Sequence, residues 1–452
     1  MTRVLYRGCA VATVDRDERE WPDGHVLCDG DAIVAVGPGA GEAPADARVV
    51  DARGCLATPG LVNCHHHLYQ WATRGLAQES TLFEWLVALY DTWAWIDAEI
   101  LAAAARAGLA SLAVSGCSTT TDHHYVFPRD AGDLLAAEID AAAAIGLRFH
   151  PCRGSMDLGR SHGGLPPDAV VEDLDSILAA TDEAITRYHD PSPTSMLRIA
   201  VAPCSPFSVT AELMREAAEL ARRSGVRLHT HLAETVEEEA FCRERFGCRP
   251  VEYLESLGWL GDDVWFAHCV HVSESEIGRL GATGTGVAHC PGSNARLGAG
   301  IAPAMAMVVA GVPVGLGVDG AASNESGVLQ LELKQALLMS RARYGPASMA
   351  CREALALGTI HGARCLGRAA EIGSLEVGKR ADVALWRVDD LGAAGIEDPV
   401  AALVLGPPRR CEELLVAGRV VVAGGALATG SETAIAADAA RASRRLAERA
   451  AA

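Results

Sequence analysis

The residues best suited to chemistry are the imidazoles of His65 and His67, in a run of three consecutive histidines. They follow the apolar run 55–62, which predicts a buried strand. Side chains alternate between the two faces of a strand, so His65 and His67 can reach one point while His66 faces away. A solvated histidine cluster is the plain alternative, and the position directly after an apolar strand argues against it. Because neutral imidazole binds zinc well, the spacing indicates half of a metal site.

The other ligands would come from two distant segments. His229 and His231 stand at the end of the run 226–231 with the same period of two, and either imidazole could complete the site. Asp319 ends the run 312–319, where a carboxylate could bind the metal and also accept a proton. An Asp-Gly pair is common in turns, so Asp319 gains its catalytic interpretation from the histidines. The predicted metal ligands are His65, His67, His231 and Asp319.

Two further residues could move protons or stabilise developing charge. Glu234 lies three residues beyond His231, where a carboxyl group beside a dry cavity can have a raised pKa. Its plain alternative is a glutamate at the start of a helix. His268 ends the apolar run 264–268 and could stabilise the oxygen of a tetrahedral intermediate, although single histidines in such places are more often core residues. Weaker candidates of the same kind are His271, His289 and His123.

Four residues near other predicted strand ends could line a substrate site. Gln70 offers both a donor and an acceptor, and Arg153 can donate to a carbonyl oxygen. His124 and Cys204 are the other two candidates. For each of the four, packing behind the site is as good an interpretation as direct contact.

The elements that must position these residues alternate between apolar strand-like runs and Ala/Leu-rich helical runs. Such alternation predicts βα units around a parallel sheet. Eight strand candidates end at or near residues 67, 124, 153, 204, 231, 268, 289 and 319. We therefore expect an α/β fold, a (β/α)8 TIM-like barrel whose strand ends carry the chemistry.

Short β-type runs occur at both ends of the chain, and neither set is long enough to bury both of its faces. We expect the two termini to form one small, discontinuous β-sandwich. The predicted division is 1–57 for the first part of the sandwich, 58–370 for the barrel, and 371–452 for the second part with a C-terminal helix.

Composition narrows the classes of partner. The 452-residue chain has a formal net charge of −19, which would repel nucleic acid. The fourteen cysteines form no closely spaced framework, and the N-terminus shows no long apolar stretch. The uncharged run 301–318 is interrupted by prolines and glycines, so it is a poor membrane span. We expect a cytoplasmic protein with reduced thiols that binds neither membranes nor nucleic acid.

The combined motifs resemble the amidohydrolase superfamily over nearly the whole chain. The resemblance depends on Pro59-Gly60-Leu61-Val62-Asn63 before His-x-His, on the His231/Glu234 pair, on His268 and on Asp319. Finer motifs resemble the 8-oxoguanine deaminases, and related triazine hydrolases share much of the same pattern. These motifs are His65-His66-His67-Leu68-Tyr69-Gln70, Asp122-His123-His124-Tyr125, Ala202-Pro203-Cys204-Ser205 and His289-Cys290-Pro291-Gly292-Ser293-Asn294.

The resemblance implies a zinc-dependent deaminase that acts on a small heterocyclic base, with 8-oxoguanine converted to uric acid and ammonia. Isoxanthopterin deaminase and s-triazine aminohydrolase are alternative activities, and a metal-free scaffold protein is an alternative of a different class. In this reaction Asp319 would accept a proton from water, Glu234 would protonate the ring, and His268 would stabilise the new oxygen. Relatives of this kind also make a homo-oligomer the expected assembly.

One metal ion per chain is expected. Barrels of this kind often hold two ions through a carboxylated lysine. The chain has only Lys334 and Lys379, and no lysine lies between His65 and Asp319. We therefore predict one ion rather than a lysine-bridged pair.

Overall fold

The computed structural model describes residues 3–452, so Met1 and Thr2 of the predicted segment 1–57 lie outside the described residues. At its centre is a closed barrel of parallel strands. Within the described residues the barrel order is β10 (Ala200–Pro203), β11 (Arg227–Leu232), β12 (Val264–His268), β13 (Gly286–His289), β14 (Val314–Leu316), β6 (Leu61–Asn63), β8 (Cys117–His124) and β9 (Arg148–Ser155). The predicted eight-stranded barrel is confirmed.

Two barrel strands are shorter than the sequence pattern suggests. β6 ends at Asn63 and β14 at Leu316, before the histidines and the aspartate that we assigned to the strand ends. Those residues instead form a separate parallel pair, β7 (His66–His67) with β15 (Asp319–Gly320). Asp319 has a φ of 59°, a left-handed conformation that a continuous strand does not accommodate. The chain therefore turns inward at the mouth of the barrel.

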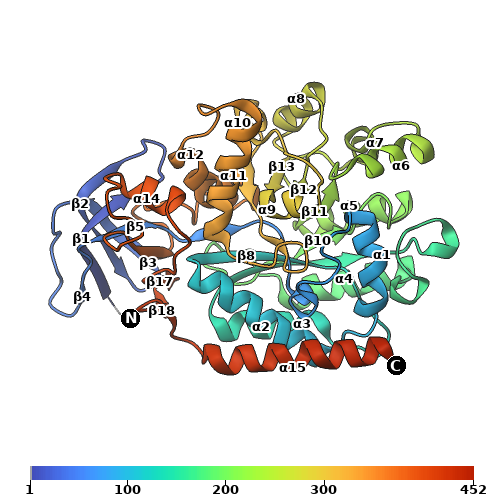
Figure 1. Cartoon of the computed structure of the whole chain (residues 1–452), viewed down its shortest axis with the longest axis horizontal. Helices are drawn as coiled ribbons and strands as arrows, with labels where there is room; N and C mark the ends of the chain where they lie inside the picture. The colour runs from blue at the N-terminus through green and yellow to red at the C-terminus, as the bar shows by residue number, and fades with distance from the viewer. Residues whose placement is uncertain (1–2) are drawn as a thin grey trace.

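Helices surround the barrel strands, and a large apolar core fills the space between the two layers (Figure 1). The helices are α1 (Leu82–Trp93), α2 (Ala98–Val114), α3 (Leu134–Ile145), α4 (Leu174–Tyr188), α5 (Ala211–Ser224), α6 (Val236–Phe246), α7 (Pro250–Ser256), α8 (Glu274–Thr283), α9 (Pro291–Arg296), α10 (Ala304–Val309), α11 (Leu329–Tyr344), α12 (Cys351–Ala356), α13 (Gly362–Cys365), α14 (Pro399–Leu405) and α15 (Glu432–Ala451), with a 3-10 turn η1 (Leu68–Thr73). None of the helices within 3–452 has the length and apolar composition that crossing a bilayer requires.

Local sequence explains where these helices begin and end. In α5, the Thr210 hydroxyl accepts a hydrogen bond from the Leu213 N–H, and Gly225 ends the helix with a φ of 67°. The predicted C-terminal helix is α15, which lies along α2 (Figure 1) and is held there by ion pairs from Arg445 and Arg449 to Asp97.

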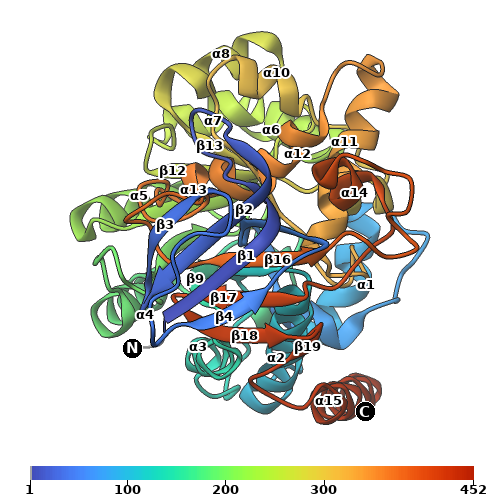
Figure 2. The ribbon, with the colours of Figure 1, turned by 90° about the vertical axis from the view of Figure 1, so that its left-hand side faces the viewer.

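Both termini contribute to a second sheet, as expected. Within the described residues it has nine strands, in the order β19 (Ala426–Leu427), β18 (Arg419–Ala423), β17 (Glu413–Val416), β16 (Val383–Arg387), β5 (Cys55–Pro59), β1 (Arg3–Ala12), β2 (Glu20–Asp29) and β3 (Ala32–Pro38), with β4 (Arg48–Asp51) also paired to β1. Figure 2 looks onto this sheet, where strands from the two ends of the chain lie side by side. β5 runs to Pro59, and the domain boundaries at 57 and 370 stay a prediction.

Candidate active site

Four predicted ligands converge at the mouth of the barrel. Asp319 Oδ1 lies 3.3 Å from the Nε2 atoms of both His65 and His67. The Nε2 atoms of His67 and His231 are 3.1 Å apart. The register of β7 with β15 places His66 beside Asp319, so this small sheet sets the spacing between the histidine and aspartate segments. All four side chains are buried or nearly so, the most exposed being His231 at 8%.

Hydrogen bonds at the far side of each ring determine which nitrogen is free. His67 Nδ1 donates to the His123 carbonyl and His231 Nδ1 donates to the Cys204 carbonyl, each over 2.7 Å. In a neutral imidazole the opposite nitrogen then carries a lone pair and no hydrogen. The two Nε2 lone pairs of His67 and His231 face each other at 3.1 Å, which is repulsive unless a cation lies between them.

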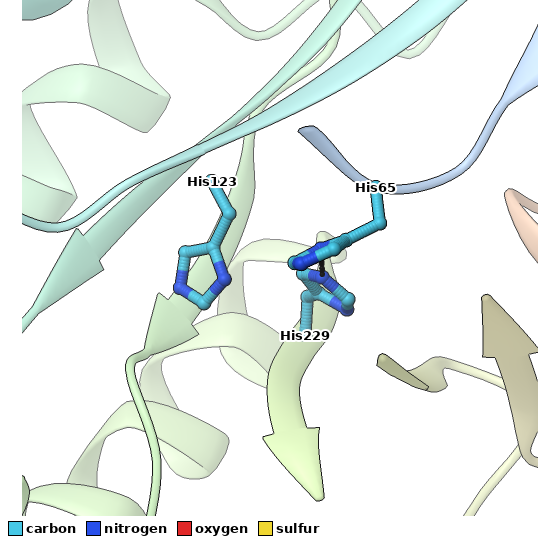
Figure 3. Close-up of side chains that lie close together, drawn as sticks. All are labelled: His65, His123 and His229. Atoms are coloured by element: carbon cyan, nitrogen blue, oxygen red, sulfur yellow. Dashed lines mark hydrogen bonds between the residues drawn. The ribbon is translucent and has the colours of Figure 1, made fainter. Parts of the chain in front are cut away.

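His65 follows the same pattern through a second imidazole. Its Nδ1 is 2.8 Å from His229 Nε2, and His229 Nδ1 donates to the Trp265 carbonyl over 2.8 Å. Both nitrogens of His229 are thus engaged, whereas His65 Nε2 is buried without a hydrogen-bond partner. Figure 3 shows His229 beneath His65, with His123 on a neighbouring strand. Of the two histidines left open by the sequence, His231 is the one with a free nitrogen.

Asp319 is held as an anion. Burial opposes its ionisation, and hydroxyl groups that donate to one of its oxygens favour it. Its second oxygen, Oδ2, accepts hydrogen bonds from Ser293 over 2.6 Å and from Ser323 over 3.2 Å. One carboxylate oxygen is therefore fixed by hydroxyl groups while the other faces the histidines.

Glu234 and His268 form a second pair beside this cluster. His268 Nε2 lies 3.5 Å from Glu234 Oε2 and 3.9 Å from Asp319 Oδ2. The Asn294 side-chain oxygen, 2.9 Å from His268 Nδ1, orients the ring. Burial, followed by the charges of Asp319 and Glu238, raises the pKa of Glu234 well above its ordinary value, which favours the protonated form of this carboxyl. The pair can donate hydrogen bonds and a proton into the same space.

The pair is positioned by unusual backbone. His268 has a φ of 72° and Ala233 a φ of 51°, conformations that cost energy outside glycine and that cluster at functional sites. Glu238 stabilises the turn, because its carboxylate accepts the N–H groups of Ala233 and Glu234 over 2.8 Å each. The protein thus holds this segment in a strained conformation next to the histidines.

A cavity of about 370 Å³, its open mouth included, lies over these groups. Residues of α1 form an apolar roof, and Gln70 and Cys204 contribute uncharged polar groups. Burial raises the pKa of Cys204 to about 12, which keeps its thiol neutral. The residues that line the cavity include His67, Gln70, Leu82, Trp85, Leu86, Tyr90, Tyr125, Cys204, Phe207, His231, Glu234, His268, Leu297 and Asp319.

Gln70 depends on a glycine for its position. A Cβ atom at Gly320 would lie 1.7 Å from the Gln70 side-chain oxygen, so only glycine leaves room for this amide. That oxygen is buried and has no hydrogen-bond partner in the described protein, which leaves it free to accept one from a ligand.

The other two predicted substrate residues lie outside the lining of this cavity. Arg153 points to Glu172, with nitrogen–oxygen distances of 2.7 and 2.9 Å, and its guanidinium lies 3.8 Å from the centroid of the Phe127 ring. His124 is 3.0 Å from Glu138 and 2.7 Å from the Val126 carbonyl. Their polar atoms are engaged behind the wall of the site.

Several supporting residues were missed by the sequence analysis. Ser293, which donates to Asp319, and Asn294, which orients His268, lie in the 289–294 motif, but nothing in their spacing assigned them a partner. Ser323, the second donor to Asp319, lies outside the motifs. Glu238 lies four residues after Glu234, one helical turn away, which is a signal that could have indicated it.

The fold and this mouth define a class of enzyme, the barrel hydrolases whose strand ends carry histidine and aspartate. A model of the amidohydrolase family matches residues 56–421. The chain is 46% identical to the 8-oxoguanine deaminase of Pseudomonas aeruginosa, over 89% of this chain and 90% of that protein. It is 41% identical to an isoxanthopterin deaminase from an unknown prokaryotic organism, over 87% of this chain and 85% of that protein.

A solved structure agrees with this relationship. The atrazine chlorohydrolase of Arthrobacter aurescens TC1, crystallised in complex with zinc, superimposes with a TM-score of 0.93 at 35% identity, covering 97% of this chain and 100% of that one. The chain described here belongs to the amidohydrolase family. It is a deaminase or hydrolase of that family.

Proposed function

We propose that the protein is a hydrolytic deaminase of an oxidised purine, converting 8-oxoguanine and water to uric acid and ammonia. The observation that carries the proposal is the convergence of unprotonated imidazole nitrogens with Asp319, next to the Glu234–His268 pair and under an apolar roof. The likeness to an 8-oxoguanine deaminase supports the choice of substrate.

The donor set fits one divalent ion, for which zinc is our proposal. His65, His67, His231 and Asp319 would hold it, because three nitrogen lone pairs and one carboxylate oxygen are the donors that zinc prefers. Such an ion supplies Lewis acidity and lowers the pKa of a water molecule toward ~7. The solved zinc complex of the related chlorohydrolase supports this choice of metal.

The chain's own residues then account for the proton transfers. Asp319, anionic at neutral pH, accepts a proton from the water that attacks the amino-bearing ring carbon. Glu234, whose raised pKa favours the protonated form, gives its proton to the adjacent ring nitrogen. His268 lies between the two carboxyl groups and stabilises the new oxygen. The C–N bond breaks as the proton held by Asp319 leaves with ammonia, and the hydroxyl proton of the intermediate passes to Glu234, which forms the new carbonyl and restores the carboxyl group.

The cavity favours a flat, uncharged base. Gln70 and Cys204 present an amide and a neutral thiol, which can pair with the polar edge of a purine. Trp85, Leu86 and Tyr90 of α1 cover the opposite side and leave no charged group there to bind a phosphate. A free base therefore fits this space better than a nucleotide does.

Isoxanthopterin is the second candidate substrate. It is a fused, oxidised heterocycle of similar outline, and the related isoxanthopterin deaminase supports it. An s-triazine amine is a third candidate, supported by the related chlorohydrolase. We propose 8-oxoguanine first because of the higher identity of the corresponding relative.

Ammonia release with each candidate base tests the proposal. Purified protein supplied with zinc is assayed on 8-oxoguanine, isoxanthopterin, guanine, cytosine, adenosine and an aminotriazine. We expect kcat/KM to be highest for 8-oxoguanine, with uric acid as the product detected by its absorbance. A higher kcat/KM for the pterin or the triazine would refute 8-oxoguanine as the preferred substrate. No ammonia release from any of these bases would favour a scaffold protein.

A further inference from the structure

The closed end of the barrel, opposite the mouth, carries a layer of arginines. Arg148 and Arg227 begin β9 and β11, and Arg198 lies two residues before β10, so three adjacent strands each contribute one. The guanidinium of Arg227 lies 5.9 Å from the centroid of the Trp265 ring, and the His150 ring lies 5.8 Å from it. These side chains therefore point into the barrel, below the histidine layer.

Arg368, which follows α13, joins this layer from below. Its Nη2 and the Nη1 of Arg148 both donate to the Ser195 carbonyl, over 2.8 and 2.7 Å. Its Nε donates to Glu371 over 2.7 Å, and Arg198 donates to the same carboxylate over 2.6 Å. Because they share these acceptors, the three guanidinium groups lie within one hydrogen-bonded network.

Several nitrogens in this layer have no partner. Arg368 Nη1 and His150 Nδ1 are buried and unpaired, in side chains exposed by 0% and 1% respectively. The Nε atoms of Arg198 and Arg227 are also buried and unpaired. A buried guanidinium N–H without an acceptor is costly and rare, so three such nitrogens beside one unpaired imidazole nitrogen at one end of a barrel point to a ligand that accepts hydrogen bonds.

The charge of the layer points the same way. Within residues 3–452, only two carboxylates form ion pairs with its four arginines, Asp382 with Arg148 and Glu371 with Arg198 and Arg368. Burial and then the charges of Arg148 and Arg198 lower the pKa of Arg368 to about 10, still well above neutrality. The layer thus holds excess positive charge away from water.

We propose that this closed end binds a small inorganic monoanion of the chloride class, held by Arg368, Arg198, Arg227 and His150. A monovalent halide is favoured over sulfate or phosphate because a divalent anion would lose far more hydration free energy on moving from water to these buried nitrogens. The proposal does not depend on the enzymatic activity proposed above. An ordered water molecule in the same place is the competing outcome.

Thermal unfolding in different sodium salts tests the proposal in solution. Wild-type protein is dialysed into sodium gluconate, and chloride or sulfate then replaces gluconate at constant ionic strength. We expect chloride to raise Tm by about 2 °C with saturation, because an anion bound only to the folded state stabilises it by mass action. Sulfate, which stabilises folded proteins by exclusion from their surface, should raise Tm only gradually and without saturation. Equal Tm values in chloride and gluconate would refute the site.

A matched pair of variants locates the effect. Arg368→Gln removes the central donor and should abolish the chloride increment, whatever its effect on Tm in gluconate. Arg352→Gln is the control, because Arg352 is a half-exposed arginine paired with Glu20 and Asp398 on the surface, and its increment should persist. An unchanged increment in Arg368→Gln would refute the assignment.

A crystal grown with bromide provides a test that needs no variant. Anomalous scattering should show bromide within about 3.5 Å of the free nitrogen of Arg368. A water molecule there instead, in crystals containing bromide, would overturn the proposal even if chloride stabilises the protein from another site.

Discussion

The two ends of the barrel are both polar and buried, but they have opposite chemistry. On β11 the inward positions are Arg227, His229 and His231, which run from the closed end to the mouth at a period of two. At the mouth, unprotonated imidazole nitrogens face Asp319 and lack a donor. At the closed end, guanidinium groups lack an acceptor. On β11, a single inward-facing residue, His229, thus separates the proposed cation site at the mouth from the proposed anion site at the closed end.

This difference indicates how the barrel divides its tasks. The mouth has strained backbone at Asp319 and His268, with φ values of 59° and 72°, and an open cavity, which are features of a site that works on a ligand. The closed end joins the barrel to the terminal sheet, since Arg148 pairs with Asp382 next to β16. Substitutions at the mouth should therefore change turnover, and substitutions at the closed end should change stability.

The largest effect is expected from Asp319→Asn. The amide keeps the size of the side chain and can remain near Ser293, but it cannot accept a proton and binds a cation weakly. Ammonia release should fall by about 10³-fold or more, while circular dichroism shows an intact fold. A rate within tenfold of wild type would remove Asp319 from the mechanism.

Arg148→Met tests the other end of the barrel. It leaves Asp382 as an unpaired buried carboxylate, so the free energy of unfolding should drop by about 3–5 kcal/mol. Denaturant titration measures this drop, and kcat of the folded variant should stay within about twofold of wild type, since positioning of the mouth does not depend on this pair. A loss of kcat comparable to that of Asp319→Asn would break the proposed division of tasks. Arg352→Gln on the surface, the control, should cost less than about 1 kcal/mol.

Glu234→Gln should lower kcat by about 10²-fold and change its dependence on pH. Because the pKa of Glu234 is raised, wild-type kcat should be sustained at neutral pH and fall as the pH rises and this carboxyl loses its proton. The glutamine side chain of the variant does not titrate, so the decline of kcat at alkaline pH should disappear. A pH profile that keeps the same alkaline limb would assign that limb to another group.

The smallest effect concerns Glu138, behind the wall of the mouth. Burial raises its pKa from 4.5 to about 8, so the folded protein binds this proton more tightly than the unfolded chain does. The stabilisation that the protonated Glu138 carboxyl contributes to the folded protein is fully present below pH 4.5 and is lost as the pH rises through about 8. Glu138→Gln, which can still donate to His124, should lose less stability between pH 5 and 8 than wild type. The same dependence of the free energy of unfolding on pH in both proteins would contradict this prediction.

Much of the barrel and of the histidine cluster at its mouth could be predicted from the sequence. Strand ends are marked by apolar runs that turn polar, and a period of two places His65 and His67 on one face, so periodicity alone indicated that these imidazoles share a site. The choice of His231 over His229 could not be made this way. It depends on which ring nitrogen each backbone carbonyl engages, and that follows from the tertiary register of β11 with β10 and β12.

The arginine layer also depends on tertiary structure that sequence periodicity does not predict. Arg148, Arg198, Arg227 and Arg368 are far apart in the chain, and each could be a surface residue by its own sequence context. Only closure of the barrel brings them to one end, where Arg148, Arg198 and Arg368 share one carbonyl and one carboxylate. For Arg153, the sequence indicated a polar group at a strand end, but its salt bridge with Glu172 is formed by a loop that no local pattern predicts.

Metal content is the most direct test of the central claim, that the mouth of this barrel holds one catalytic divalent ion. Elemental analysis of purified wild-type protein and of His231→Ala, prepared in parallel with zinc in the growth medium, gives the stoichiometry. We predict about one divalent ion per chain in wild type and almost none in the variant. Full ammonia-releasing activity in wild-type protein without bound metal, or the same metal content in both proteins, would contradict the account.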